Sequence, residues 1–373
     1  MDEATPKNPG PGGPPGPIDS MTPAQPVIPP IKPLDAQALK KARAHLDRLT
    51  KPPGSLGYLE DWVARLVAVR SPHPPRLQEK TVFVFAADHG VAEEGVSAFP
   101  QEVTGQMVRN FLAGGAAINV LARFAGVRVQ VVDMGVNADL AEHPDLFRYP
   151  VGPGTRNFAN EWAMTRPQAV QALETGMSLA RRAASSGVHI LATGDMGIGN
   201  TTAAAAMIAA LGPAPPAEVT GRGTGIDSDG LNRKIKLIEQ ALARHQPNPR
   251  DPLDVLAKVG GFEIGGIAGL ILGAAAEGLP VVVDGVISGA GALLALRLAP
   301  ACRDYLFPAH RSAEPGARVV LEAFSLPPLL DLQLRLGEGT GAVLGIHLLE
   351  AGLKLYTEMA TFDDAGVNQK NES

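Results

Sequence analysis

The chain has 373 residues, with 33 Lys and Arg against 38 Asp and Glu, and 45% of its residues are hydrophobic, which is enough for a large core. The single cysteine, Cys302, excludes a disulfide scaffold and any zinc or iron–sulfur site built from several cysteines. A formal net charge of −5 gives no bulk electrostatic reason to bind nucleic acid. The most apolar stretch, 264–283, is broken by glycines, Glu277 and Pro280, so it predicts a buried helix and strand and no membrane span.

Residues 1–34 contain 11 of the 33 prolines and few large apolar side chains. Because proline lacks an N–H donor and clashes with the preceding helical turn, we predict a disordered leader over this range. The leader has no basic start followed by an apolar run, so it is not a secretory signal, and we expect a cytoplasmic protein. Residues 366–373 are expected to form a short tail.

Two amphipathic helices are predicted after the leader, within residues 35–75 and before any strand. Asp35 is a candidate N-cap of the first, in which Leu39, Ala42 and Leu46 recur at helical spacing. The second is YLEDWVARLVAVR at 58–70. These helices are expected to form a small bundle ahead of a larger domain at 76–365.

Four apolar runs that are typical of strands follow, at 81–90, 127–135, 188–197 and 280–285, each leading into a glycine-rich turn and a helical stretch. Such alternation predicts an α/β fold, with a parallel sheet covered by helices on both faces. Ligands of these sheets bind beyond the carboxyl ends of the strands. Each run places an aspartate at that end, either for a site or to cap the next helix: Asp88, Asp133, Asp195 and Asp284.

Two glycine-rich turns are candidate anion sites. TGDMGIGNTTAAAAMIAAL at 193–211 predicts a helix near Asn200, whose first N–H groups and the hydroxyls of Thr201 and Thr202 would bind phosphate or carboxylate. GRGTGIDSDGLNRK at 221–234 adds Lys234, a second candidate phosphate ligand. Ordinary helix caps and solvated helix charges remain the alternative for both segments.

Two carboxylates stand in glycine-rich surroundings. Glu263 lies in VGGFEIGGIAG, where a buried charge must be paired, hydrogen-bonded or protonated. Glu338 lies between two glycines before a helix, as a candidate ligand contact, a general base or a simple helix cap. A helix N-terminus would lower the pKa of Glu338, so a base at neutral pH would need apolar walls. The histidines show no HxH or HExxH spacing, so no metal is expected.

Seven blocks taken together resemble the nicotinate-nucleotide–dimethylbenzimidazole phosphoribosyltransferases, and the resemblance spans about 38–365. In chain order they read KPPGSLGYLE, AADHGVAEEGVSAFPQEVTGQM, GDMGIGNTTAAAA, GRGTGIDSDGLNRK, VGGFEIGGIAG, AHRSAEPGA and LRLGEGTGA. The resemblance implies a Rossmann-like parallel sheet, a small helical domain built from distant segments that include residues 35–75 and part of the C-terminal region, and a homodimer.

The resemblance also implies the reaction. The phosphoribosyl group of nicotinate mononucleotide would pass to 5,6-dimethylbenzimidazole, giving α-ribazole 5′-phosphate and nicotinate, with no cofactor. Glu338 would be the general base, and Asp195, which stands where the family often has Glu, would join it as a catalytic residue. Another aromatic acceptor with the same donor, or a non-catalytic nucleotide-binding module, are the alternatives.

The remaining site residues are carried over from the same motifs. Positions expected around the nucleotide and its phosphate are Gly197, Asn200, Thr201, Thr202, Gly223, Lys234, Ser312 and Arg335, with Glu263 near the ribose. Leu336 should border the base pocket, where Phe99 would pack against the aromatic base and Gln106 would supply a hydrogen bond. A structural role is expected for Asp88 and His89.

Overall fold

The computed structural model describes residues 25–71, 76–324 and 326–368. Six strands form one parallel sheet in the order β3-β2-β1-β4-β5-β6. The strands are β1 (Lys80–Ala87), β2 (Arg128–Gly135), β3 (Leu146–Arg148), β4 (Ile190–Met196), β5 (Val281–Val283) and β6 (Leu306–Pro308). The four predicted runs are confirmed as β1, β2, β4 and β5, whereas the two short edge strands had not been predicted.

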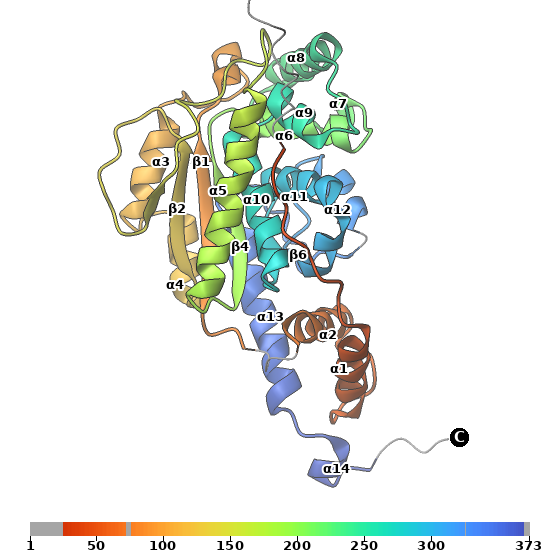
Figure 1. Ribbon diagram of the computed structural model, residues 1–373. Coiled ribbons are helices and arrows are strands. Elements are labelled where there is room, and N and C mark those ends of the chain that lie inside the picture. The colour runs from red at the N-terminus through yellow and green to blue at the C-terminus, as the bar shows by residue number, and fades with distance from the viewer. Residues whose placement is uncertain (1–24, 72–75, 325, 369–373) are drawn as a thin grey trace, which may run out of the picture.

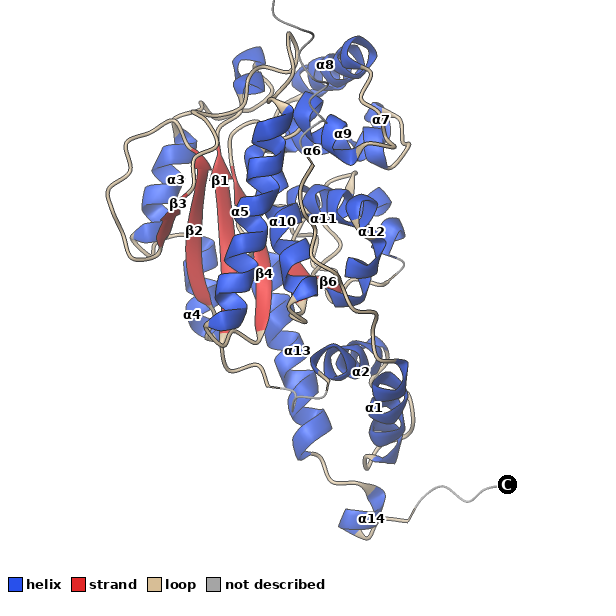
Figure 2. Ribbon diagram, viewed as in Figure 1, coloured by secondary structure: helices blue, strands red, loops and turns tan. Residues whose placement is uncertain are grey.

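Helices surround this sheet (Figures 1 and 2). They are α1 (Ala36–Arg48), α2 (Tyr58–Arg70), α3 (Val103–Leu112), α4 (Ala117–Ala125), α5 (Arg166–Ser185), α6 (Asn200–Leu211), α7 (Pro216–Val219), α8 (Ser228–His245), α9 (Pro252–Val259), α10 (Phe262–Ala276), α11 (Val286–Leu298), α12 (Ala317–Phe324), α13 (Thr340–Glu358) and α14 (Phe362–Ala365). Two 3₁₀ segments, η1 (Gly90–Glu94) and η2 (Pro300–Tyr305), complete the described elements.

The central strand β1 is buried along its whole length, which explains its continuous apolar sequence. Its side chains alternate between two cores. Phe83 and Phe85 pack with α5, α6, α10 and α11, and Val82 and Val84 pack with α3, α4 and α13. In Figure 2, α5 passes in front of the sheet and α13 lies behind it. The prediction of a sheet covered on both faces is therefore confirmed.

The small helical part is built from both ends of the chain. Leu46 and Leu49 at the end of α1 pack with Val63 of α2, and Tyr356 of α13 packs against the same cluster. An isolated antiparallel bridge joins Leu49 to Thr361, which precedes α14. These helices lie together at one end of the molecule (Figure 1). The expectation of a small helical domain formed from separate segments is confirmed.

The predicted leader is wrong for its last ten residues, because 25–34 include a segment that packs on the large domain. Ile28, Ile31 and Leu34 lie against the main core. The N–H of Leu34 donates to a carboxylate oxygen of Asp304 over 3.1 Å, and the Tyr305 hydroxyl donates to the carbonyl of Lys32 over 2.8 Å. Spaced apolar residues thus hold an extended, proline-rich chain on the surface. Residues 1–24 and 369–373 lie outside the described residues.

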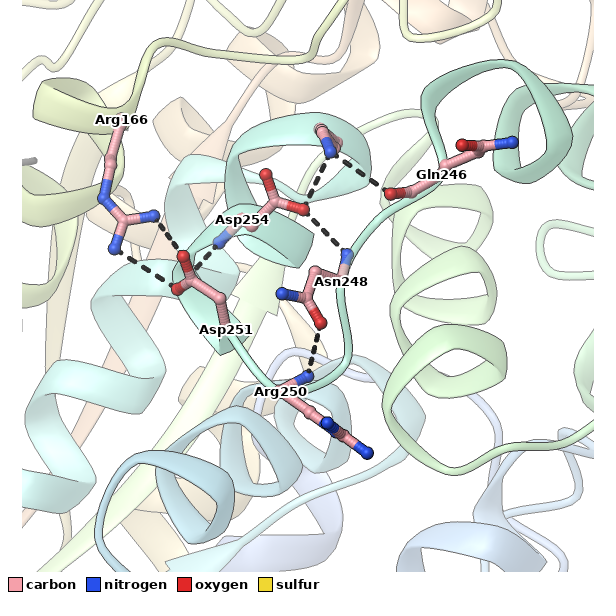
Figure 3. Close-up of polar contacts among 7 residues, drawn as sticks. Arg166, Gln246, Asn248, Arg250, Asp251 and Asp254 are labelled. Atoms are coloured by element: carbon pink, nitrogen blue, oxygen red, sulfur yellow. Dashed lines mark hydrogen bonds and ion pairs between the residues drawn. The ribbon is translucent and has the colours of Figure 1, made fainter.

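A polar cluster fixes the loop before α9 (Figure 3). Asp251 caps α9 and forms an ion pair with Arg166 of α5 at 2.6 Å. Asp254 accepts from the N–H of Asn248 over 2.7 Å and pairs with Lys258 over 2.8 Å. The cluster ties the first turn of α5 to the segment that leads into α10 and Glu263. Within the described residues, no helix is long and apolar enough to cross a membrane.

Candidate active site

A cavity of about 410 Å³ opens beyond the carboxyl ends of the strands. Its walls come from six parts of the chain: the α3 region, the turn after β4, the loop at 223–224, the segment after β5, the segment after β6, and the loop before α13. The lining residues are Phe99, Val103, Met107, Asp195, Met196, Gly197, Ile198, Asn200, Thr201, Gly223, Thr224, Gly285, Val286, Ile287, His310, Ser312, Glu314, Arg335, Leu336, Gly337 and Glu338. The position matches the one expected for ligands of a parallel sheet.

Glu338 lies in a strained backbone at the edge of this cavity. Its φ is +62°, between Gly337 at +85° and Gly339 at +92°, so three successive residues are left-handed. Such a conformation is costly for a residue with a side chain and is concentrated at functional sites. The Glu338 carboxylate is buried and accepts a hydrogen bond from the N–H of Ile118, in the first turn of α4, over 3.3 Å.

The surroundings of Glu338 make its carboxyl more basic than usual. Burial raises the pKa of Glu338, the Ile118 hydrogen bond lowers it, and the charge of Asp284 raises it, so the net shift is upward. Burial therefore shifts the pKa of Glu338 in the direction that a base at neutral pH requires. The helix N-terminus near this residue belongs to α4 as well as to α13.

Asp284 holds the loop that carries Glu338. One of its carboxylate oxygens accepts from the N–H of Gly339 over 3.2 Å, and the other accepts from the N–H of Ala342 over 2.9 Å. Asp284 therefore caps α13 across the sheet edge and not the helix that follows it in sequence, which is α11. The Nε2 atom of His310, a cavity-lining residue, lies 3.6 Å from the same carboxylate.

Asp195 ends β4 beside this loop and is almost fully buried. One of its oxygens accepts from the Asn200 amide over 3.3 Å, and the other has no hydrogen-bond partner in the described part of the chain. The pKa of Asp195 is raised well above its usual value by burial and by the charges of Asp284, Glu263 and Glu338. A carboxyl in these surroundings tends to hold its proton.

The turn after β4 forms the opposite wall, where the backbone approaches the cavity closely. Gly199, with φ +97°, precedes α6, and Asn200 and Thr201 of its first turn line the cavity. Helix N-termini attract anions, although the N–H groups of Asn200 and Thr202 here donate to the carbonyls of Gly197 and Gly199 over 3.1 and 2.9 Å. Thr202 is fully buried and does not line the cavity.

Lys234 lies behind this wall and reaches it through Thr201. Its Nζ donates to the Thr201 hydroxyl over 2.8 Å and to the carbonyl of Gly221 over 3.3 Å. Burial lowers the pKa of Lys234 to about 8, although the charge of Glu314 acts in the opposite direction. Glu314 in turn accepts from the N–H of Gly223 over 3.1 Å.

Glu263, which is expected near the ribose, lies close to this region but is not among the residues that line the cavity. Its carboxylate pairs with Nε2 of His89 at 2.9 Å, and both side chains are fully buried. The pair lies under the turn after β4, where a Cβ on Gly199 would stand 3.1 Å from the Cβ of His89. The contact with His89 engages one carboxylate oxygen, whereas Oε2 of Glu263 and Nδ1 of His89 have no hydrogen-bond partner among the described residues.

Apolar side chains line another part of the cavity, and one of them, Leu336, belongs to the loop of Glu338 itself. Phe99 and Leu336 line the cavity with exposed fractions of 53% and 59%, and Val103 and Met107 of α3 lie beside them. Gln106 is exposed on α3 and does not line the cavity, so the structure does not place it for the expected hydrogen bond. Val103 and Met107 were missed, although their spacing of four in QEVTGQM marks one helix face.

Metal binding requires several ligands in reach of one point. Across 25–71, 76–324 and 326–368, no group of three or more His, Cys, Asp or Glu side chains is placed to hold a metal ion. The carboxylates of the site are instead engaged by backbone N–H groups, an amide and two histidines.

Comparison with known proteins identifies the class of protein: a family model described as phosphoribosyltransferase matches residues 31–367. Two relatives named nicotinate-nucleotide–dimethylbenzimidazole phosphoribosyltransferase are 59% identical over 341 residues (Chloroflexus aggregans; 91% of this chain, 97% of the relative) and 58% identical over 335 residues (Geobacter sulfurreducens; 90% and 95%). The crystal structure of CobT from Thermus thermophilus superposes with a TM-score of 0.86 at 53% identity, over 90% of this chain and 100% of that one. This chain belongs to the nicotinate-nucleotide–dimethylbenzimidazole phosphoribosyltransferase family, as its motifs had predicted.

Proposed function

We propose that the chain transfers the phosphoribosyl group of nicotinate mononucleotide to 5,6-dimethylbenzimidazole, giving α-ribazole 5′-phosphate and nicotinate. Relatives that are 58–59% identical over nine-tenths of the chain carry the name of this reaction. The observation that supports it within the site is Glu338, a buried carboxylate of raised pKa at the edge of a cavity with one anion-binding wall and one apolar wall.

Glu338 is the proposed general base. One nitrogen of the acceptor attacks the anomeric carbon while the other loses its proton to the Glu338 carboxylate. Nicotinate leaves as the carbon–nitrogen bond to the pyridinium breaks, and that electron pair returns to the ring, so the departure needs no acid. Attack on the face opposite nicotinate converts the β-nucleotide into an α-nucleotide. The raised pKa of Glu338 supports the role, because a base works best near the operating pH.

The phosphate is proposed to lie against the first turn of α6. The positive end of α6, the Thr201 hydroxyl and the ammonium group of Lys234 behind it supply a donor and positive charge. Gly223 completes the wall, since a side chain there would crowd the Thr201 hydroxyl at 2.7 Å. Ser312 and Arg335 line the cavity within the same rim and are proposed contacts of the nucleotide.

The acceptor base is proposed to pack between Phe99 and Leu336, with Val103 and Met107 beneath it. These four apolar side chains give a slot for a flat ring close to Glu338. Asp195 lines the cavity beside the loop of Glu338, and this position supports a contact between its carboxyl group and the ribose.

We further propose that the chain works as a homodimer in the cytoplasm. Val120 and Phe124 on α4 are 53% and 70% exposed, and the Phe124 ring lies 5.0 Å from that of His347 on α13. A second copy of the chain is the proposed occupant of this apolar face, in line with the family resemblance. Light scattering of the purified protein should give twice the chain mass, and Phe124→Asp should shift it toward the monomer.

The reaction is tested with purified, EDTA-treated protein, nicotinate mononucleotide and 5,6-dimethylbenzimidazole, with products separated by chromatography and identified by mass. We expect nicotinate and α-ribazole 5′-phosphate in equal amounts. Nicotinate without the α-nucleotide would indicate hydrolysis and contradict the proposed transfer. Turnover only with a purine or a phenol would reassign the acceptor, and binding of the nucleotide without any turnover would contradict the proposal that the chain is an enzyme.

A further inference from the structure

His310 follows β6 and lines the cavity, but it is not explained by the proposed chemistry. Its imidazole is almost fully buried, with Nε2 at 3.6 Å from Oδ1 of Asp284, and Nδ1 has no hydrogen-bond partner in the part of the chain that the structure describes. A backbone bridge to Leu330 fixes the segment. The polar contact of Nε2 is with the carboxylate of Asp284.

Asp284 also contacts the loop that carries the proposed base, Glu338. Its two carboxylate oxygens accept from the N–H groups of Gly339 and Ala342, on either side of the first residues of α13. Gly339 directly follows Glu338, whose φ of +62° must be held by its surroundings. A chain of contacts thus runs from the cavity wall at His310, through Asp284, to the backbone beside Glu338.

The charges around His310 favour its protonated form. Burial lowers the pKa of His310, but the contact with Asp284, the charge of Asp284, a backbone hydrogen bond with Arg311 and the charge of Asp331 together outweigh burial and raise it. Asp331 itself pairs with Arg311 over 3.2 Å. The first turns of α11 and α13, which pack against this point, carry no acidic side chain.

The charge of Asp284 affects the pKa values of two neighbouring carboxyl groups, those of Glu338 and Asp195. The charge of Asp284 contributes to the raised pKa of Glu338 and of Asp195, after burial in both cases. Glu263 adds to the field at Asp195 and is itself paired with His89. A protonated imidazole next to Asp284 therefore offsets part of the negative charge that Glu338 experiences.

We propose that His310 is a positioning residue for the base: through Asp284 it holds the loop of Glu338, and its positive charge keeps the Glu338 carboxylate ionised at lower pH than Asp284 alone would allow. This inference rests on the proposed role of Glu338. It assigns two separable effects to one side chain, a tether and a charge.

The test compares pH profiles of kcat and kcat/KM for the wild type, His310→Gln and His310→Ala. Gln keeps an N–H donor toward Asp284 but carries no charge, whereas Ala removes both. We expect the acid limb to move up by roughly 0.5–1 pH unit in both variants, because Asp284 then raises the pKa of Glu338 without compensation. The plateau kcat should stay within about twofold in His310→Gln and fall roughly tenfold in His310→Ala.

His143→Gln is the matched control, because His143 lies on the loop before β3, away from the cavity, with 34% of its side chain exposed. The pH profile of His143→Gln should equal that of the wild type. Ionisation of the substrates affects all variants equally, so it cannot produce a difference between them. An unmoved acid limb in His310→Gln would overturn the charge effect, and an unchanged plateau in folded His310→Ala would overturn the tether. Should His310→Ala fail to fold, His310→Gln still decides the charge effect. Full turnover in Glu338→Gln would instead show that Glu338 is not the base, and this outcome is distinct from a failure of the His310 proposal.

Discussion

The main-chain N–H of Ile118 donates a hydrogen bond to Oε2 of Glu338 over 3.3 Å, although the two residues are 220 positions apart in the chain. The donor belongs to the first turn of α4, so the positive end of that helix faces the carboxylate. The contact lowers the pKa of Glu338 while burial raises it by more. The basicity and the direction of this side chain are thus set by elements remote from its own loop.

Removal of the carboxylate is the most direct test of this arrangement. Glu338→Gln keeps the size of the side chain and an acceptor for the Ile118 N–H, but it cannot take a proton. We expect kcat to fall by roughly 10²–10⁴, the range for a lost general base, with the circular dichroism spectrum unchanged. Glu358→Gln at the exposed end of α13 is the control and should keep wild-type turnover. Wild-type turnover in Glu338→Gln would show that the base lies elsewhere.

Gly194 tests the backbone of the same loop. A Cβ on this β4 residue would collide with the main-chain carbonyl of Glu338, and space there exists only because the residue is glycine. Gly194→Ala is expected to displace Glu338 and lower kcat at least tenfold, since small misplacements of reacting groups are costly. Gly187→Ala is the control, because it has φ +78° and no atom within 4 Å of its Cβ position. Gly187→Ala should be less stable than the wild type but keep its turnover. Equal losses of kcat in Gly194→Ala and Gly187→Ala would contradict the claim that Gly194 positions Glu338.

The sequence predicted the central strands because each is a continuous apolar run flanked by glycine-rich turns, as β1 and β4 show. It did not predict β3 and β6, because LFR and LFP end in Arg and Pro and give no apolar run, whereas the equally short β5 reads VVV. The packing of Ile28, Ile31 and Leu34 was hidden by the prolines between them. Composition argued for disorder there, while three spaced apolar side chains were enough to hold the segment.

The candidate site shows the same division between local and long-range information. Glu338 and the turn before α6 could be found from their own glycines, which mark backbone in need of positive φ. The hydrogen-bond partners of Asp284 could not be predicted from the sequence. A carboxylate at a strand end is expected to cap the next helix, whereas Asp284 caps α13. His310 had no visible partner for the same reason: its contact with Asp284 exists only once β5 and β6 lie side by side.

Lys234 gives a prediction in the alkaline range. Its pKa of about 8 means that the ammonium charge is lost as the pH rises through that value. We expect kcat/KM for nicotinate mononucleotide to fall above about pH 8 in the wild type, because the phosphate then faces a neutral amine. Lys234→Met should raise KM for the nucleotide about tenfold and abolish this alkaline limb. Lys236 lies two residues further along the chain and is exposed, so Lys236→Met should keep the wild-type KM and the alkaline limb. An alkaline limb retained in Lys234→Met would contradict the assignment of this limb to Lys234.

Asp195 gives a prediction about stability. Burial and three neighbouring carboxylates raise its pKa in the folded protein, whereas the unfolded chain ionises near the usual value of about 3.9. The folded state therefore binds the proton more tightly, and stability is lost as the pH rises from the unfolded pKa through the folded one. Asp195→Asn removes this dependence, so the variant should be more stable than the wild type at pH 7, by about 1 kcal/mol, with the gain vanishing near pH 4.

Urea or thermal unfolding at both pH values measures the Asp195 effect, and Asp133 provides the contrast. Asp133 ends β2 as Asp195 ends β4, but its Oδ1 accepts from the N–H groups of Gly135 and Val136 over 3.0 and 2.9 Å. Asp133→Asn should lose stability at pH 7, because the substitution replaces the carboxyl oxygen that accepts both N–H bonds. Opposite signs at two equivalent strand ends would show that Asp195 is kept at a cost to the fold. A lower unfolding midpoint for Asp195→Asn at pH 7 would mean that the carboxylate stabilises the site it lies in.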